Sequence, residues 1–179
     1  MIILVGASAS GKTEVAKMLG KLFQMRKVIT HTTRPMRDNE KDGVDYYFVS
    51  KDEFISLKKM NFFVETTEYN DNYYGTSRKE LEDNKVLIVD PNGLQSFVKL
   101  KDPRIIAFFM NATKETRRIR MIKRGDRIED AIKRIATDDE KFNESAMDAC
   151  DYVIDSEKQS VKKCALEVYE KYASKLCLM

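Results

Sequence analysis

The chain has 179 residues, of which 42% are hydrophobic and 34% are charged, proportions typical of a globular domain with a sizeable core. Its 32 basic and 29 acidic residues leave a net charge of +3, which is too small to argue for nucleic acid as a partner. No apolar stretch has the length of a membrane span, and the three cysteines lack C-x-x-C spacing. We therefore expect one cytoplasmic domain with reduced thiols and with neither a membrane nor nucleic acid as a partner.

The chain opens with a pattern for binding phosphate groups. Residues 2–5 are an apolar, β-branched run typical of a buried strand. The next segment, Gly6-Ala7-Ser8-Ala9-Ser10-Gly11-Lys12-Thr13, matches the phosphate-binding loop G-x-x-x-x-G-K-[ST] at every fixed position. Helical spacing follows at Val15, Met18, Leu19, Leu22 and Phe23. Loop amides and a helix N-terminus bind phosphate, Lys12 reaches the β- and γ-phosphates, and the Thr13 hydroxyl holds Mg²⁺, so the pattern predicts a nucleotide site.

Further along, apolar strand-like runs alternate with helical patterns. The runs fall at residues 28–29, 86–89, 105–110 and 152–154, and residues 161–176 have the spacing of a closing helix. This alternation predicts a parallel sheet with helices on both faces. Between Thr30 and Thr76 the pattern changes to short aromatic strands around a polar turn at Asn70-Asp71-Asn72. Capping boxes are predicted at Ser50–Glu53 and Ser77–Glu80. We expect a small inserted lobe there.

Asp90 follows the run 86–89 at the carboxyl end of a predicted strand, the edge of an α/β sheet where ligands bind. A carboxylate at this position suits the organisation of a metal ion opposite a phosphate-binding loop. Because Pro91-Asn92-Gly93 follow it, Asp90 also fits the first position of a turn or helix. With the loop present we favour the metal-organising role, and the capping role stays as the alternative.

Two arginine clusters lie outside the predicted strands. Arg34 and Arg37 belong to a polar segment, where two guanidinium groups suit a clamp for a phosphate monoester. The second cluster includes Arg117, Arg120 and Arg124, which share one face of a predicted helix. Such a face is a solvated surface, a nucleic-acid contact or a lid over phosphate groups. No aromatic residues interleave it as they do in nucleic-acid-binding segments, so we favour the lid.

Together these features predict phosphoryl transfer between two phosphate-bearing substrates, a reaction that depends on positioning and charge neutralisation. An acceptor that is itself a phosphate is already ionised, so the reaction requires no general base. This agrees with a chain whose single histidine, His31, we interpret as structural.

The sequence resembles the guanylate kinase family over nearly its whole length. The phosphate-binding loop carries the resemblance together with residues 30–49 (THTTRPMRDNEKDGVDYYFV), 63–77 (FVETTEYNDNYYGTS), 90–93 and 117–134. The resemblance implies the α/β fold of a P-loop nucleoside monophosphate (NMP) kinase, in which helices flank a central parallel sheet. The single implied domain divides into a core (1–29, 77–116 and 143–179), a small mixed α/β NMP-binding lobe (30–76) and a helical lid (117–142).

The resemblance also implies roles for individual residues. The monophosphate of GMP would be held by Arg34, Arg37, Tyr46 and Tyr74, its base would be read by Thr30, Glu65 and Thr76, and Asp90 would lie near the acceptor. The ATP phosphates would bind the loop residues Gly6, Ala7, Ser8, Ala9, Ser10, Gly11, Lys12 and Thr13, with Mg²⁺ at Thr13 and Asp90. The implied catalytic residues are Lys12, Arg34, Asp90, Arg120, Arg124 and Arg134.

The assignment of Glu65 has a physical basis. Guanine presents adjacent N1–H and N2–H₂ donors that suit a carboxylate, whereas adenine leaves the carboxylate unpaired. Sites built on such hydrogen bonds reject the analogue that lacks the group by roughly 10⁴–10⁵-fold. The Thr76 hydroxyl adds a donor for guanine O6. Without the resemblance, Glu65 also fits an ordinary exposed acid at a strand end.

The sequence departs from the family pattern at several positions. Thr30 and Thr76 replace serines, which adds methyl groups to the base pocket. Ile88 replaces a second acid on the strand before Asp90, and the lid is one residue shorter. Asp155-Ser156 replaces Asn-Asp beside the expected adenine site, so the preferred donor nucleotide stays open.

The leading hypothesis is a Mg²⁺-dependent guanylate kinase that transfers the γ-phosphate of ATP to GMP, and also to dGMP, giving ADP and GDP. One alternative is a kinase for a different nucleoside monophosphate. The other is a non-catalytic guanylate-kinase-like module that binds phosphopeptides, against which the intact loop argues. We expect a monomer or homodimer whose partners are these small molecules.

Overall fold

The computed structural model describes residues 1–38, 40–69 and 71–178. Within them the central sheet is parallel throughout, and its middle strand is the one that leads into the phosphate-binding loop. Every residue of that strand is apolar and buried, as a strand with two covered faces requires. The strand order is β2 (Arg26–Lys27), β7 (Lys85–Ile88), β1 (Ile2–Val5), β8 (Ile106–Asn111) and β9 (Tyr152–Asp155).

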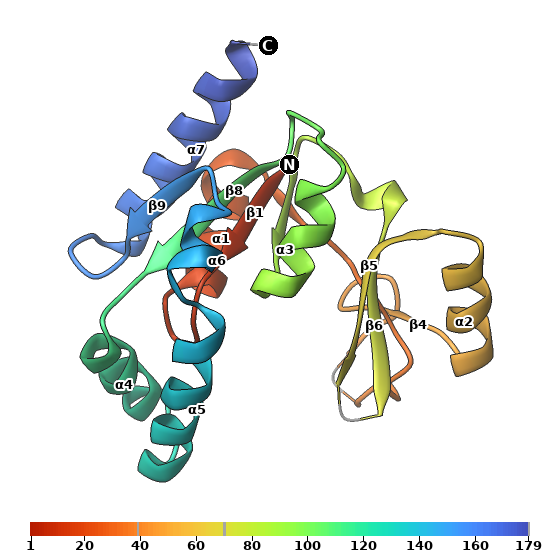
Figure 1. Cartoon of the computed structure of the whole chain (residues 1–179), viewed down its shortest axis with the longest axis horizontal. Helices are drawn as coiled ribbons and strands as arrows, with labels where there is room; N and C mark the ends of the chain where they lie inside the picture. Colours follow the sequence, from red (N-terminus) through yellow and green to blue (C-terminus); the bar gives the residue numbers. More distant parts are fainter. Residues whose placement is uncertain (39, 70, 179) are drawn as a thin grey trace.

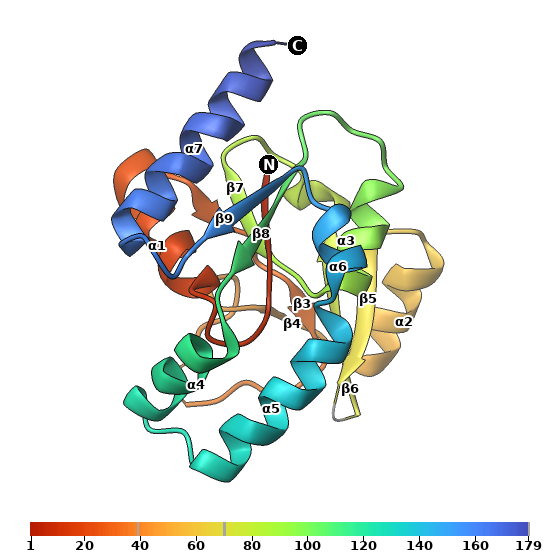
Figure 2. The same ribbon diagram turned by 60° about the vertical axis from the view of Figure 1, so that its left-hand side comes forward.

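Helices cover both faces of this sheet (Figures 1 and 2). Successive residues of β1 point to opposite faces, so Ile2 and Leu4 belong to one apolar cluster and Ile3 and Val5 to the other. The first cluster packs under α1 (Lys12–Phe23) and α7 (Val161–Cys177). The second packs under α3 (Pro91–Val98) and α6 (Glu144–Asp148).

A second sheet forms a lobe that extends from one side of the core (Figure 1). Its order is β4 (Tyr47–Phe48), β3 (His31–Thr32), β6 (Asn72–Ser77) and β5 (Phe63–Tyr69), with α2 (Lys51–Lys59) beside it. The ring of Phe54 stacks on that of Phe63 at 4.6 Å between centroids. A Cβ at Gly75 would lie 3.0 Å from both rings, so a larger residue there would have to displace them. The lobe is therefore built on an aromatic cluster of its own.

The two connections between core and lobe are joined through the buried carboxylate of Glu80. The first connection contains Ile29, and the second contains the 3₁₀ turn η1 (Arg78–Glu80). Glu80 accepts hydrogen bonds from the Lys85 ammonium at 2.8 Å and from the Ile29 N–H at 3.3 Å. Both members of the ion pair are 6% exposed. Glu80 thus links both segments that carry the lobe.

Two helices that follow β8 project from the core away from the lobe (Figure 1). They are α4 (Lys114–Lys123) and α5 (Ile128–Lys141). The Thr113 hydroxyl caps α4 by accepting the Thr116 N–H. Gly125 lies in the left-handed region at φ +97° between the two helices. No helix among the described residues is long and apolar enough to cross a membrane.

Most predicted elements are confirmed, with differences at their ends. The strand predicted at 28–29 lies at 26–27 instead, although the Val28 N–H still donates to Val86 O. Ser50 caps α2 as predicted, since its hydroxyl accepts the Glu53 N–H. The capping box at Ser77 is wrong: Ser77 makes no side-chain cap, because Glu80 turns into the core to pair with Lys85. Of the predicted turn at 70–72, Asn70 lies outside the described residues.

Candidate active site

Both fixed glycines of the phosphate-binding loop are required by the backbone. Gly6 has φ +148°, and a Cβ there would lie 2.5 Å from the Met110 carbonyl oxygen. Gly11 has φ +95° and forms the N-cap of α1. The loop therefore passes tightly against β8 and ends at a helix N-terminus, where free N–H groups and the helix dipole favour a bound anion.

The Lys12 side chain folds back onto the loop. Its ammonium group donates to Gly6 O at 2.5 Å and to Ala7 O at 2.8 Å. Burial lowers the pKa of Lys12 to about 8, and the nearby carboxylate of Asp138 opposes that shift. The structure thus holds a partly desolvated cation, whose electrostatic effect on phosphate is stronger than in water.

Cavities meet around Lys12 and Thr13 at the carboxyl edge of the sheet. The lid-side cavity, about 390 Å³, is lined by Lys12, Thr13, Arg120 and Arg124. The strand-end cavity, about 330 Å³, is lined by Lys12 together with Gly6, Ile88, Asp90 and Asp138. The lobe-side cavity, about 490 Å³, is lined by Thr13, Thr30, Tyr46 and Ile88. Lys12 therefore faces two of the spaces, and Thr13 links the lid side to the lobe side.

The lid arginines predicted from the sequence do not all reach the loop. Arg120 donates to Ala9 O at 3.2 Å and to Ser156 O at 2.6 Å, which joins α4 to the loop. Arg124 lines the lid-side cavity but pairs with Asp126 at 2.6 Å, and it lowers the pKa of that carboxyl. Arg134 is exposed and 3.5 Å from the same carboxylate. Asp126 thus holds two lid cations outside the loop in this conformation.

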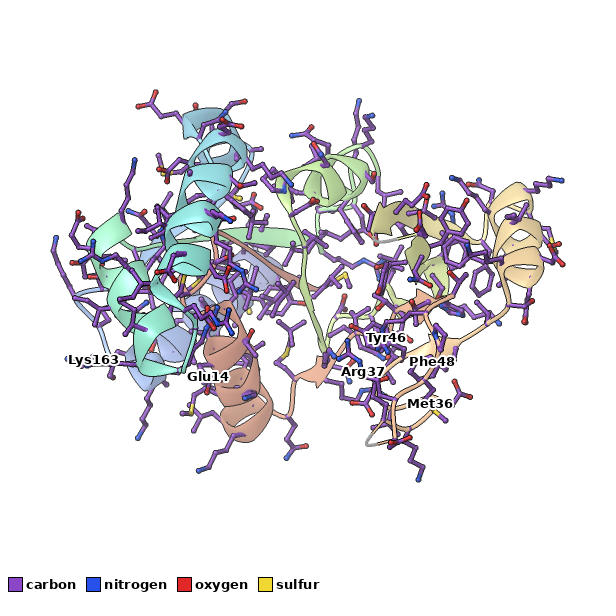
Figure 3. The ribbon with its side chains drawn as sticks, turned by 90° about the horizontal axis from the view of Figure 1, so that it is seen from below. Glu14, Met36, Arg37, Tyr46, Phe48 and Lys163 are labelled. Carbon is purple, nitrogen blue, oxygen red and sulfur yellow. The ribbon has the colours of Figure 1, made fainter. Side chains whose placement is uncertain are left out.

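Arg34 and its predicted partners gather on the lobe. Its guanidinium group pairs with Glu40 at 2.6 Å and lies over the Tyr46 ring at 5.5 Å. Tyr74 contacts Tyr46 edge-on at 6.1 Å between centroids. Arg37 is exposed, and Figure 3 shows it with Tyr46 on the part of the lobe that faces α1. These side chains form a cationic and aromatic surface opposite the phosphate-binding loop.

The predicted base-reading residues are partly assembled. Thr76 is fully buried, and its hydroxyl donates to Glu65 Oε1 at 2.7 Å, so in this structure it orients the carboxylate. Burial raises the pKa of Glu65, and the charge of Asp90 adds to that shift. Thr30 lines the lobe-side cavity, and it directly precedes His31, which pairs with Gly75 beside Thr76.

Asp90 and His31 both have structural contacts. The carboxylate of Asp90 accepts the Gly93 N–H at 2.8 Å and caps α3, so the capping role is confirmed, while its other side faces the strand-end cavity. His31 is buried against the rings of Tyr47, Phe62 and Phe63, and burial lowers its pKa. The structural interpretation of His31 agrees with this position.

The guanylate kinase profile matches residues 1–169. The chain belongs to the guanylate kinase family. It is 37% identical to the guanylate kinase of Mycoplasma pneumoniae over 141 residues, which cover 74% of this chain and 58% of that protein. It is 34% identical to that of Anaplasma phagocytophilum over 167 residues, which cover 88% and 79%. The crystal structure of guanylate kinase from Anaplasma phagocytophilum superposes with a TM-score of 0.68 at 27% identity, over 98% of this chain and 85% of that one.

The match extends to the fold of other kinases. A shikimate kinase from Acinetobacter baumannii shares the fold at a TM-score of 0.54 and 14% identity. The alignment spans less than two thirds of the Mycoplasma pneumoniae guanylate kinase. A separate alignment with the guanylate kinase from Rickettsia bellii is 47% identical over 83 residues and spans 44% of that protein.

Two polar contacts with the loop of this guanylate kinase family member were not predicted from its sequence. Ser156 is buried, and its hydroxyl donates to Ser10 O at 2.7 Å. Asp138 accepts the Ser8 N–H at 2.6 Å. A signal for Asp138 exists, because it interrupts an apolar stripe formed by Ala131 and Ile135 on α5 and by Phe142, which directly follows the helix. A carboxylate in an apolar stripe indicates a specific partner.

Proposed function

We propose that the chain is a cytoplasmic, Mg²⁺-dependent kinase that transfers the γ-phosphate of ATP to GMP and dGMP. The observation that carries the proposal is the position of Lys12, whose side chain lines both the lid-side and the strand-end cavities. A donor on the loop and an acceptor reaching in from the lobe would meet at this cation. Family membership supports the same substrates.

Cationic side chains and loop amides of the chain would neutralise the negative charge of the phosphate groups during the transfer. The loop amides and Lys12 would hold the donor phosphates, while Arg34 and Arg37 would hold the acceptor phosphate. Arg124 and Arg134 would leave Asp126 and turn toward the transferring group as the lid closes. The acceptor oxygen is already ionised, so positioning replaces general-base catalysis.

The oxygen donors near the loop fit Mg²⁺. Thr13 offers a hydroxyl and Asp90 a carboxylate, and the described residues contain no group of three His, Cys, Asp or Glu side chains that could hold a metal alone. Mg²⁺ characteristically takes one or two protein oxygens and completes its shell with phosphate oxygens and water. The ion would neutralise phosphate charge when bound.

The test is turnover of purified protein with ATP and Mg²⁺ against GMP, dGMP, IMP, AMP, UMP and dTMP. GMP and dGMP are expected to be the best acceptors. A chain that phosphorylates none of these acceptors would contradict the proposal, and a best acceptor without the N2 amino group would remove Glu65 from base recognition.

A substitution isolates the carboxylate of Glu65. Glu65→Gln replaces one acceptor oxygen by a donor and leaves the size of the side chain unchanged. We expect selectivity for GMP over AMP to fall by at least about tenfold, since one good hydrogen bond to a charged group is worth that much or more. Unchanged selectivity would contradict the assignment.

A further inference from the structure

The two lid helices contact the peptide groups on either side of the Ser8–Ala9 peptide in the phosphate-binding loop. From α5, Asp138 accepts the Ser8 N–H at 2.6 Å, a short charge-assisted hydrogen bond. From α4, Arg120 donates to Ala9 O at 3.2 Å. We call these four residues, together with Arg117, the lid root.

The lid root contains a residue with an unusual backbone conformation. Ala9 has φ +60°, a left-handed conformation that is uncommon for a residue other than glycine. Such a conformation persists only where the surroundings determine it. Here Asp138 holds the N–H of Ser8, just before Ala9, while Arg120 holds the Ala9 carbonyl. The two lid helices therefore fix this part of the loop from both sides.

Arg117 explains how a carboxylate can lie beside a phosphate site. Arg117 is 4% exposed, and it lies 3.5 Å from Asp138 and 2.9 Å from Asp139. An isolated buried carboxylate beside the loop would repel phosphate, whereas a carboxylate paired with Arg117 contributes little net charge. Asp138 can therefore fix the loop without opposing the donor.

We propose that Asp138 is a positioning residue for phosphoryl transfer. By accepting the Ser8 N–H, it holds the loop in the shape that presents its amides and Lys12 to the donor, and it couples that shape to the base of the lid. The proposal concerns the same site as the proposed function and rests on it. The acceptor lobe makes none of these contacts, so the effect should fall on the donor.

The test compares Asp138→Ala, Asp138→Asn and the control Asp139→Ala. Asp139 also pairs with Arg117 but makes no ion pair with the phosphate-binding loop, so its loss weakens only the contact between the two helices.

We expect Asp138→Ala to lower kcat roughly tenfold and to raise the KM for ATP about threefold, with the KM for GMP unchanged. The physical reason is that a small displacement of catalytic groups lowers the rate by about that much. Asp138→Asn keeps an oxygen that can accept the Ser8 N–H and should recover most of the activity. Asp139→Ala should match the wild type.

Amide hydrogen exchange provides a second readout that does not depend on turnover. The amides of residues 6–10 should exchange faster in Asp138→Ala and at wild-type rates in Asp139→Ala. Equal kinetic losses in both alanine variants, equal changes in the KM for ATP and GMP, or unchanged loop exchange would each overturn the proposal. If Asp138→Ala does not fold, Asp138→Glu replaces it, since one added methylene misplaces the carboxylate while keeping its charge. An inactive wild type would instead overturn the proposed function.

Discussion

Replacing Lys12 should remove the activity of the protein with little change in its stability. The pKa of Lys12 falls from 10.5 to about 8 on folding, and burial is the largest cause. At 1.36 kcal/mol per pKa unit, keeping this ammonium charged costs the folded state at most about 3 kcal/mol at neutral pH. Lys12→Met removes that cost and keeps most of the apolar stem.

The substitution also removes two hydrogen bonds. Gly6 O and Ala7 O lose the ammonium donor, at about 1.5 kcal/mol each for a hydrogen bond to a charged group. The two contributions nearly cancel, so Tm should change by less than about 2–4 °C, the shift that 1 kcal/mol causes in a chain of this size. Turnover should fall at least about 10²-fold, because a charge directed at the transferring phosphate is lost.

The assay is urea unfolding at pH 7 with ATP turnover measured in parallel. Lys141→Met is the matched control, since Lys141 is exposed and lines the same strand-end cavity. Its free energy of unfolding should change by less than about 0.5 kcal/mol. A Lys12→Met variant that is less stable than wild type by about 1 kcal/mol or more would refute the reasoning.

Four further predictions concern Lys12, Thr76 and Lys85. Because the folded-state pKa of Lys12 lies below 10.5, the unfolded chain binds more protons between about pH 8 and 10.5, so this group makes the fold more stable as pH rises through that window. Over the same window the Lys12 ammonium is deprotonated, so kcat/KM for ATP should fall, with a slope that approaches a tenfold decrease per pH unit. A pH–rate profile that is flat up to pH 10 would contradict this prediction. Thr76→Val removes the donor to Glu65 and should raise the KM for GMP about tenfold, with the KM for ATP as the internal control. Lys85→Met leaves Glu80 buried without its ammonium and should cost about 3 kcal/mol in urea unfolding; a loss below about 1 kcal/mol would show that the ion pair is not needed.

The sequence alone predicted the elements whose signals are local. The phosphate-binding loop could be predicted because its glycines, Lys12 and Thr13 are adjacent in the chain and because only glycine fits at Gly6 and Gly11. The β1 strand and the α1 helix could be predicted from hydrophobic periodicity, since burial imposes a period of 2 or 3.6. The family segments predicted the inserted lobe, where the structure has a second sheet, and a lid over residues 117–142, which stays a prediction.

Only the tertiary structure decided the partners of several polar side chains. Glu80 fits a capping box in sequence, but it pairs with Lys85 in the core because desolvation requires a partner for both charges. Asp138 lies 130 residues from Ser8, and nothing local to either residue selects the other. Asp126 likewise pairs with Arg124 and Arg134, which the sequence had aimed at phosphate. A side chain's type limits what it can bind, and the fold alone brings its partner within hydrogen-bond distance.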